Sequence, residues 1–567
     1  MSIVPALHLP DNEYLTTPER EEVLREEYNL MRDDHVLPPS DSNTVDENMG
    51  AVEGFLRRYL STSPPPITAD DPPDGSAVQA DEPSETTALL PDRLSSRTSG
   101  ATSLAGEESW EAAVLSGKIQ TTWRRETQIL VRYSRPLVVT FLLHYSLLIA
   151  GIVAVGHLGT MELGAASLAN MTANITGYAV YQGLATSLDT LCAQAYGSGR
   201  KDLVGLQMQR MIYFLWLATI PIAALWLCSA AILRRIIPDP ALADLAGLSL
   251  RILVLGAPGY AAFEAGKRFL QAQGLFSATL YVLLVCAPLN AFLSWLFVWK
   301  FQWGFVGAPI AIVVTENLLP LGLLLYVVVV GGRECWPGFT WRAMNNWGPM
   351  IRLALPGLLM VEAEWLAFEI LTLAASYFSN THLAAQSIIS NVLALMYMVP
   401  FPISIAASTR IANLIGAALS NAAKTSIRVS LVASGIVGLL NASLLFLLRS
   451  YIPRLYTNDP AVIALVARIL PIGATFQLFD ALAACCNGVL RGLGRQSIGG
   501  WVNLFAYYAI AMPISFGTGF GLHWELAGLW TGPAIALAVV ATVEGWFIYR
   551  TKGEEVVEEA RKRNLLL

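Results

Sequence analysis

The sequence predicts an all-α polytopic membrane protein with twelve transmembrane helices in two pseudo-symmetric six-helix lobes behind a disordered N-terminal tail. Of its 567 residues, 54% are hydrophobic and only 14% are charged, whereas soluble domains carry about 25% charged residues. Long apolar blocks separated by short polar loops run from about residue 136 to residue 549, as expected of membrane-spanning helices. Three short motifs also recur in both halves in the same order.

The first 115 residues are rich in Pro, Ser, Thr, Asp and Glu, and such a composition buries too little apolar surface to offset the entropy of ordering. We predict that residues 1–115 form a disordered cytoplasmic tail and that 116–135 form a basic approach to the membrane. Within the tail, Glu85, Leu89 and Leu90 match an acidic dileucine signal, which would recruit a sorting adaptor and favour the vacuolar over the plasma membrane. The alternative is a chance match.

The apolar blocks predict the spans and their grouping. Spans 136–156, 167–191, 211–233, 245–265, 276–299 and 306–330 form an N-lobe within residues 136–335. Spans 353–378, 384–408, 429–448, 463–489, 497–516 and 526–549 form a C-lobe within residues 336–549. Residues 550–567 form a polar C-terminal tail. Basic residues concentrate in loops on the side of the N-terminus, so both termini are predicted to be cytoplasmic.

The two lobes are predicted to be copies of one unit. Residues 162–168 resemble 382–388, 251–256 resemble 468–473, and 269–274 resemble 489–494. Because each half has an even number of spans, the copies share one topology and are related by an axis along the membrane normal. Transporters with such repeats place their substrate between the halves near the midplane.

Three acids interrupt the otherwise apolar span 353–378, namely Glu362, Glu364 and Glu369. An ionised carboxyl at the centre of a membrane helix costs about 2.5–3.5 kcal/mol on insertion scales, so such groups must be protonated, paired or turned toward a wet cavity. Helical spacing places Glu362, Trp365 and Glu369 on one face and Glu364 well over a right angle from Glu369. We interpret this stretch as the working site of a transporter. The alternative is a buried ion pair that only joins helices.

Other function classes find no support in the sequence. It shows no cleavable signal peptide, no basic nucleic-acid surface and no glycine-rich nucleotide loop. The six cysteines and the histidines lack the spacing of disulfides or metal ligands, and no catalytic set is visible. We therefore expect a non-enzymatic monomer without a metal or other cofactor, whose partners are small organic substrates and the lipid bilayer. A non-transporting membrane receptor and an intramembrane enzyme are rival interpretations.

The chain from about residue 132 to 549 resembles a eukaryotic, fungal-type multidrug and toxic compound extrusion (MATE) transporter. The motifs that carry the resemblance are residues 189–197, 364–369, 408–413 and 489–492. The resemblance implies two six-helix lobes forming a V and export of organic cations or other xenobiotics in exchange for protons. Sodium coupling and flipping of a lipid-linked substrate, both found on related folds, are alternatives within transport.

The resemblance also implies roles for particular residues. Glu364, Glu369 and Asp480 fall on the family's proton-coupling and substrate-binding carboxylates, Asn174 on its N-lobe asparagine and Tyr397 on its eighth-helix tyrosine. Burial and neighbouring acids both oppose ionisation of a carboxyl, so a proton and a cationic substrate would compete for this cluster.

The sequence also departs from the family pattern. Asn391 stands where many relatives carry a glutamate, and it can hydrogen-bond a substrate but cannot titrate. Glu362 and Glu316 are additional intramembrane acids, and Glu316 either takes part in coupling or partners a neighbouring polar group. Trp365, Phe368 and Tyr397 either line the cavity as aromatic surface for varied ligands or belong to the core or the lipid face.

Overall fold

The computed structural model describes residues 121–237 and 239–566. These residues all fall within one compact unit. The tail predicted for residues 1–115, with Glu85, Leu89 and Leu90, lies outside the described residues. In the described part of the chain every regular element is a helix, which confirms the predicted all-α fold class.

The N bundle holds the helices of the predicted N-lobe. Its elements are α4 (Trp123–Gly156), α5 (Thr160–Ala173), the π-helical turn η1 (Asn174–Tyr178), α6 (Ala179–Ala185), α7 (Ser187–Gly197), α8 (Lys201–Leu227), α9 (Ser229–Ile236), α10 (Pro240–Leu253), α11 (Ala257–Ala272), α12 (Ser277–Trp295), η2 (Leu296–Lys300), η3 (Gly304–Val306) and α13 (Gly307–Val329). Two short turns, η4 (Arg333–Cys335) and η5 (Trp341–Met344), lead to the second bundle.

The C bundle holds the helices of the predicted C-lobe. Its elements are α14 (Gly348–Ser376), α15 (Asn380–Tyr397), α16 (Pro400–Gly416), α17 (Ser420–Leu447), η6 (Ile452–Leu455), α18 (Pro460–Leu493), α19 (Gln496–Phe505), η7 (Ala506–Ala511), α20 (Met512–Phe516), η8 (Gly517–Gly521) and α21 (Glu525–Arg550). A final helix, α22 (Gly553–Leu566), follows it.

Each of the twelve predicted spans falls on helical structure. Within the described residues, nine helical stretches are long and apolar enough to cross a membrane, and α10 with α11, bent by 55°, makes a tenth. The other two predicted spans coincide with α5 to α7, which η1 interrupts, and with α14, which carries Glu362, Glu364 and Glu369. Local breaks and acidic residues therefore account for the difference.

Both bundles begin their fourth span with the same capping chemistry. The Asp239 carboxylate accepts a hydrogen bond from the backbone N–H of Ala241 at 2.9 Å, and Asp459 accepts one from Ala461 at the same distance. Each aspartate precedes a proline in the first turn, where the missing N–H costs no hydrogen bond. The shared cap supports the predicted repeat.

Two predicted boundaries differ from the structure at the chain's ends. The basic approach is not a separate segment, because α4 begins at Trp123 and continues without a break into the first span. The C-terminal segment is also more than a polar tail, since α22 buries Val556 and Ala560 in a core shared with α16 and α17. Helix α22 also reaches the N bundle, where the Arg200 guanidinium donates to the Asn564 carbonyl at 2.7 Å.

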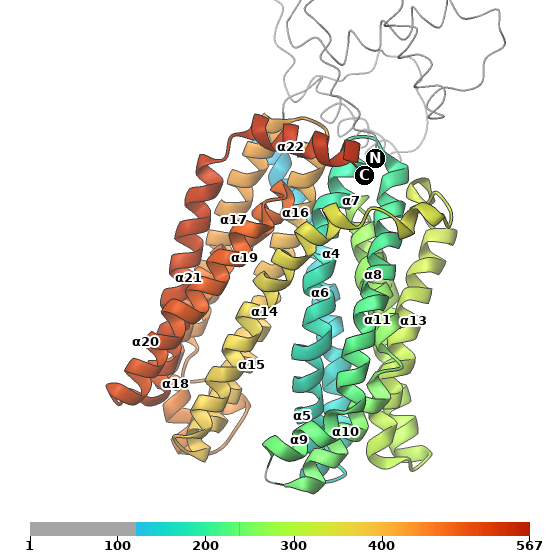
Figure 1. The fold of residues 1–567 in the computed structure, drawn as a ribbon. Coiled ribbons are helices and arrows are strands. Elements are labelled where there is room, and N and C mark those ends of the chain that lie inside the picture. The colour runs from blue at the N-terminus through green and yellow to red at the C-terminus, as the bar shows by residue number, and fades with distance from the viewer. Residues whose placement is uncertain (1–120, 238, 567) are drawn as a thin grey trace, which may run out of the picture. The chain divides into compact units, whose positions relative to one another are not determined.

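The bundles meet at the end that carries α7, α16 and α22, which we call the closed end, and lie farther apart toward α9 and α20 (Figure 1). Glycines allow the backbones of α7 and α16 to touch there. A Cβ at Gly197 would lie 2.0 Å from the Asn413 carbonyl oxygen, and one at Gly416 would lie 2.2 Å from that of Gln194. Only glycine permits this approach.

Candidate functional site

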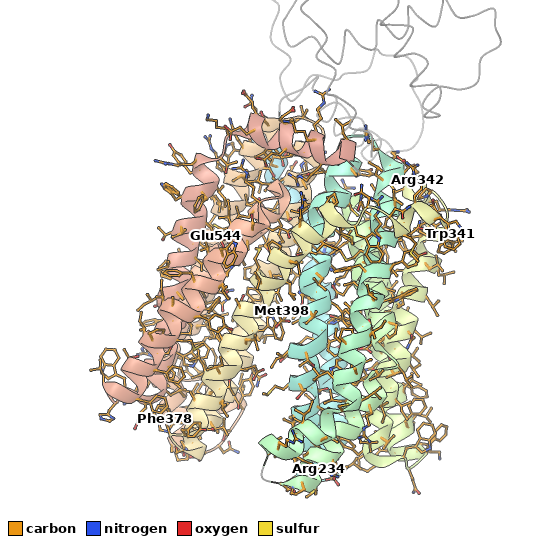
Figure 2. The ribbon with its side chains drawn as sticks, viewed as in Figure 1. Arg234, Trp341, Arg342, Phe378, Met398 and Glu544 are labelled. Atoms are coloured by element: carbon orange, nitrogen blue, oxygen red, sulfur yellow. The ribbon has the colours of Figure 1, made fainter. Side chains whose placement is uncertain are left out.

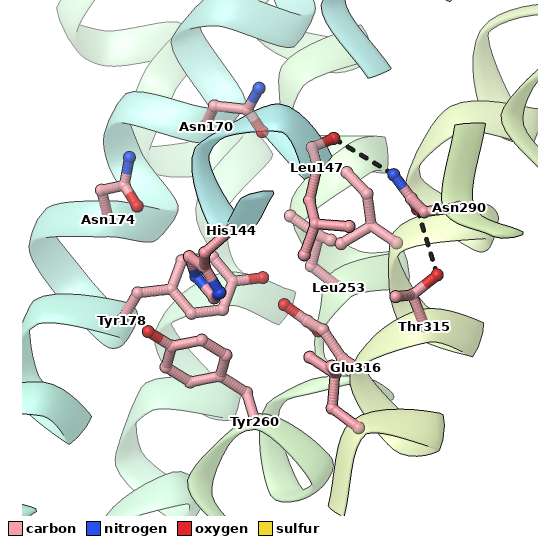
Figure 3. A pocket seen from close by; sticks show the side chains of 12 residues that line it. His144, Leu147, Asn170, Asn174, Tyr178, Leu253, Tyr260, Asn290, Thr315 and Glu316 are labelled. Carbon is pink, nitrogen blue, oxygen red and sulfur yellow. Dashed lines mark hydrogen bonds between the residues drawn. The ribbon is translucent and has the colours of Figure 1, made fainter. Parts of the chain in front are cut away.

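A cavity of about 80 Å³, lined by both polar and apolar side chains, lies inside the N bundle between α4, α5, η1, α10, α11, α12 and α13 (Figure 3). Two of the predicted site residues, Asn174 and Glu316, line it. Four further polar or aromatic side chains complete much of its wall: His144, Tyr178, Tyr260 and Asn290. None of these four residues was predicted from the sequence.

The Glu316 carboxyl occupies this cavity without a hydrogen-bond partner for Oε2 among the described residues. The side chain is 7% exposed, and the Tyr178 hydroxyl points toward it (Figure 3) without reaching hydrogen-bond geometry. A Cβ at Gly256, in the break between α10 and α11, would lie 2.0 Å from Glu316 Oε2. The bend between these helices therefore makes room for the carboxyl.

In the C bundle, Glu364 of α14 and Asp480 of α18 lie close enough to interact electrostatically. Asp480 is 4% exposed, and its Oδ2 accepts a weak hydrogen bond from Gln477 at 3.4 Å. The side chains of Tyr397 and Tyr507 each lie near both acids. Within the described ranges, neither acid forms an ion pair with a lysine, arginine or histidine.

The other two acids of α14 stand apart from this pair. Glu369 is half-buried, and it has no hydrogen-bond or ion-pair partner within residues 121–566 as described. Glu362 lies near Tyr508, and its Oε1 is buried without a partner in the same part of the chain. Of the three carboxylates predicted to cluster, the structure brings together Glu364 and Asp480.

The aromatic candidates have different surroundings. Phe368 packs in the C-bundle core, with its ring 5.7 Å from that of Phe476 and 5.8 Å from that of Trp530, which favours the core interpretation. Trp365 is 41% exposed. Tyr397 stacks on Phe401 with ring centroids 5.2 Å apart.

Asn391, the residue that replaces a glutamate, joins the two bundles. Its Oδ1 accepts a hydrogen bond of 3.2 Å from the Tyr145 hydroxyl of α4, and its Nδ2 donates to the Ser387 carbonyl at 2.8 Å. The side chain is exposed. An amide at this position therefore bridges the bundles without adding charge.

The closed end contains a buried charged network that was not predicted from the sequence. Asp189 of α7 lies 3.2 Å from the Arg268 Nε of α11 and 3.9 Å from the Arg491 Nε of α18. Glu264 pairs with both Arg268 and Lys267 at 2.5 Å. Asp189 thus contacts an arginine of each bundle. The rule applied to α14, that a charge within a span is costly, would have selected Asp189 and Glu264, whereas Lys267, Arg268 and Arg491 lie beyond the predicted ends of their spans.

Comparisons with known proteins agree with this architecture. The MatE family model matches residues 136–296 and 356–516, one segment in each bundle. An uncharacterized transporter of Saccharomyces cerevisiae is 44% identical over 78% of this chain and 64% of its own length. Multidrug and toxin extrusion protein 2 of Mus musculus is 34% identical over 79% of this chain and 78% of its own length. The crystal structure of the eukaryotic MATE transporter AtDTX14 superposes with a TM-score of 0.75 at 30% identity, covering 78% of this chain and all of that one.

The two helical bundles and these matches define a multi-pass membrane transporter and not an enzyme. More specifically, the chain belongs to the MATE family. This confirms the resemblance found in the sequence.

The repeat relates the two polar sites to each other. The matched segments begin at 136 and 356 and end at 296 and 516, so an offset of 220 residues relates them. With this offset Glu364 corresponds to His144, which lines the N-bundle cavity. The same position thus carries an acid in the C bundle and an imidazole in the N bundle.

Proposed function

We propose that the protein exports small organic compounds, often cationic, by exchanging them for protons through alternating access. The observation that carries the proposal is the juxtaposition of Glu364 and Asp480, two carboxyls from different helices that form no ion pair with a cationic side chain among the described residues; Asp480 is buried and Glu364 is partly buried. A buried carboxylate requires either a proton or a positive partner. A cationic substrate and a proton can therefore replace one another there.

The competition sets the direction of transport. Protonation from the acidic side removes the charge that holds the substrate, and deprotonation toward the cytoplasm restores it. The excess of basic residues in the loops at the closed end supports placing that end, with both termini, in the cytoplasm. In this orientation the present conformation is closed on the cytoplasmic side. A closed cytoplasmic side prevents a substrate released on the opposite side from returning to the cytoplasm.

The test is uptake of a fluorescent organic cation into proteoliposomes under an imposed pH gradient. We expect uptake to follow the gradient in the unmodified chain and to fall at least about tenfold in Glu364→Gln and Asp480→Asn, because an amide cannot exchange a proton. The matched control is Glu334→Gln, which neutralises an exposed acid paired with Lys201 at the surface. Uptake that persists in both site variants would refute the proposed site.

The same vesicles distinguish the alternative couplings. Uptake that requires a sodium gradient and ignores pH would indicate sodium coupling. Movement of a fluorescent lipid-linked probe, without uptake of soluble cations, would indicate a flippase. Adding Glu369→Gln and Glu316→Gln to the panel tests whether either of these acids contributes to coupling.

We also propose the vacuolar membrane as the site of action, reached through an adaptor that reads Glu85, Leu89 and Leu90. The support is the sequence pattern alone. Loss of vacuolar fluorescence from a tagged chain carrying Leu89→Ala with Leu90→Ala is the expected result, and an unchanged distribution would reject the signal.

A further inference from the structure

Glu544 of α21 is an acid that neither the sequence motifs nor the proposed transport site uses. It is fully buried, at 0% exposure, in the half of the C bundle nearer the closed end (Figure 2). Its Oε1 accepts a long hydrogen bond of 3.5 Å from Asn503. Its Oε2 is buried without a hydrogen-bond partner among the described residues.

The groups that face Glu544 come from three packed elements. Arg491 and Cys486 of α18 and Tyr507 of η7 interact with it electrostatically, and Asn503 of α19 donates the long hydrogen bond. Arg491 carries the one full positive charge in this group. We call the contact surface between the two bundles at the closed end the seam. Arg491 lies between two acids, Asp189 across the seam and Glu544 within its own bundle.

The two sides of the seam differ in how their charges balance. On the N-bundle side, Asp189 and Glu264 balance Lys267 and Arg268 within one network. On the C-bundle side, Arg491 reaches the negative charge of Asp189 only across the seam. When the bundles separate, Asp189 keeps Arg268 as its partner, whereas Arg491 loses Asp189 and needs a new anion.

We propose that Glu544 is a further proton-binding site, whose carboxyl holds a proton while Arg491 pairs with Asp189 and ionises when the closed end opens. The O–H bond of the carboxyl breaks, the carboxylate pairs with Arg491, and the proton passes to water that enters between the separating bundles. The inference rests on the proposed exchange of protons. With the closed end toward the cytoplasm, the proton leaves on the side to which an exporter must deliver it.

The geometry also links this site to the proposed transport pair. Tyr397 interacts electrostatically with Arg491 as well as with Glu364 and Asp480. Tyr397 therefore lies beside both the seam and the proposed transport pair.

The test measures opening of the closed end by labelling a cysteine at position 194 with a membrane-impermeant maleimide. Gln194 is 1% exposed and contacts the Gly492 carbonyl across the seam, so Gln194→Cys is protected until the bundles part. The exposed Cys228 is replaced by alanine to remove its background. The reporter chain also carries Glu364→Gln and Asp480→Asn, so that the remaining pH dependence does not come from the transport pair.

Because maleimide reacts with the thiolate, the labelling rate is divided at each pH by the rate for the same chain after denaturation. In this background we expect the normalised rate to rise with pH, by up to about tenfold per pH unit for one released proton, and to become independent of pH in Glu544→Gln. Glu525→Gln, an acid-to-amide change at the exposed start of the same helix, should keep the slope. If Glu544→Gln alone is not monodisperse, Glu544→Gln with Arg491→Gln removes both charges and should also abolish the slope.

The proposal is wrong if the pH dependence of labelling persists in Glu544→Gln. It is also wrong if the reporter chain shows no pH dependence of labelling before Glu544 is changed. Neither result affects the proposed function, because that function is tested separately by gradient-driven uptake in the chain without the reporter substitutions.

Discussion

The ion pair between Glu126 and Arg410 provides the sharpest stability prediction. The Arg410 guanidinium donates to the two Glu126 oxygens at 3.0 and 2.7 Å, and the side chains of Arg410 and Glu126 are 4% and 1% exposed. The pair attaches the first turns of α4 to α16 at the closed end. Because Arg410 would lose two charge-assisted hydrogen bonds in buried surroundings, Glu126→Gln should lower the free energy of unfolding by about 3–5 kcal/mol.

The measurement is a double-mutant cycle on detergent-solubilised protein, with the free energy of unfolding obtained from mixed-micelle denaturation. Arg410→Gln should cost a similar amount, and the double variant should cost clearly less than the two single changes together, because each single change already removes the shared contact. Additive effects, or a single-variant cost below about 1 kcal/mol, would refute the assignment of this pair as a buried and desolvated contact.

Three further predictions concern the seam between the bundles. Gly197→Ala should at least halve gradient-driven uptake without unfolding the chain. The reason is that the added methyl group would lie 2.0 Å from the Asn413 carbonyl oxygen when the closed end is shut. Normal uptake would contradict this close approach of α7 and α16. Deleting residues 553–566 should increase maleimide labelling of the Gln194→Cys reporter severalfold, since α22 contacts both bundles. Unchanged labelling would show that α22 does not hold the bundles together. Asn391→Asp should make uptake more dependent on pH because it adds a titratable group opposite Tyr145; a pH profile that matches the unmodified chain would show that this position does not contact the transport path.

Much of the fold was predictable because membrane spans follow from long apolar runs. All twelve predicted spans lie on helices, although the breaks at η1 and between α10 and α11 were missed. Mean hydropathy alone does not show such breaks, although Gly256, Pro258 and Gly259 at the bend between α10 and α11 are a local sequence signal. The extension of α4 back to Trp123 was also missed, because the partner that stabilises its polar first turns, Arg410, is 284 residues away from Glu126 in the chain.

The site was predictable where the cost of burying charge could be read from one helix. That reasoning selected α14, and helical spacing predicts that Glu364 and Glu369 lie on different faces of this helix. It did not select His144 or Tyr260, whose side chains are ordinary in an apolar span and gain significance only from the cavity around Glu316.

The acids of α14 have a consequence for biogenesis. This helix fails the apolarity criterion that nine other helical stretches pass among the described residues, and each ionised acid would add about 2.5–3.5 kcal/mol to the cost of entering the bilayer from the translocon. Helix α14 contacts α6 of the first half and α19 of the second half. These contacts can remove its acids from lipid only after both neighbouring helices have been synthesised. The helix that carries the proposed transport acids therefore depends on neighbouring helices during synthesis, and defects in those neighbours should appear first as failed membrane integration.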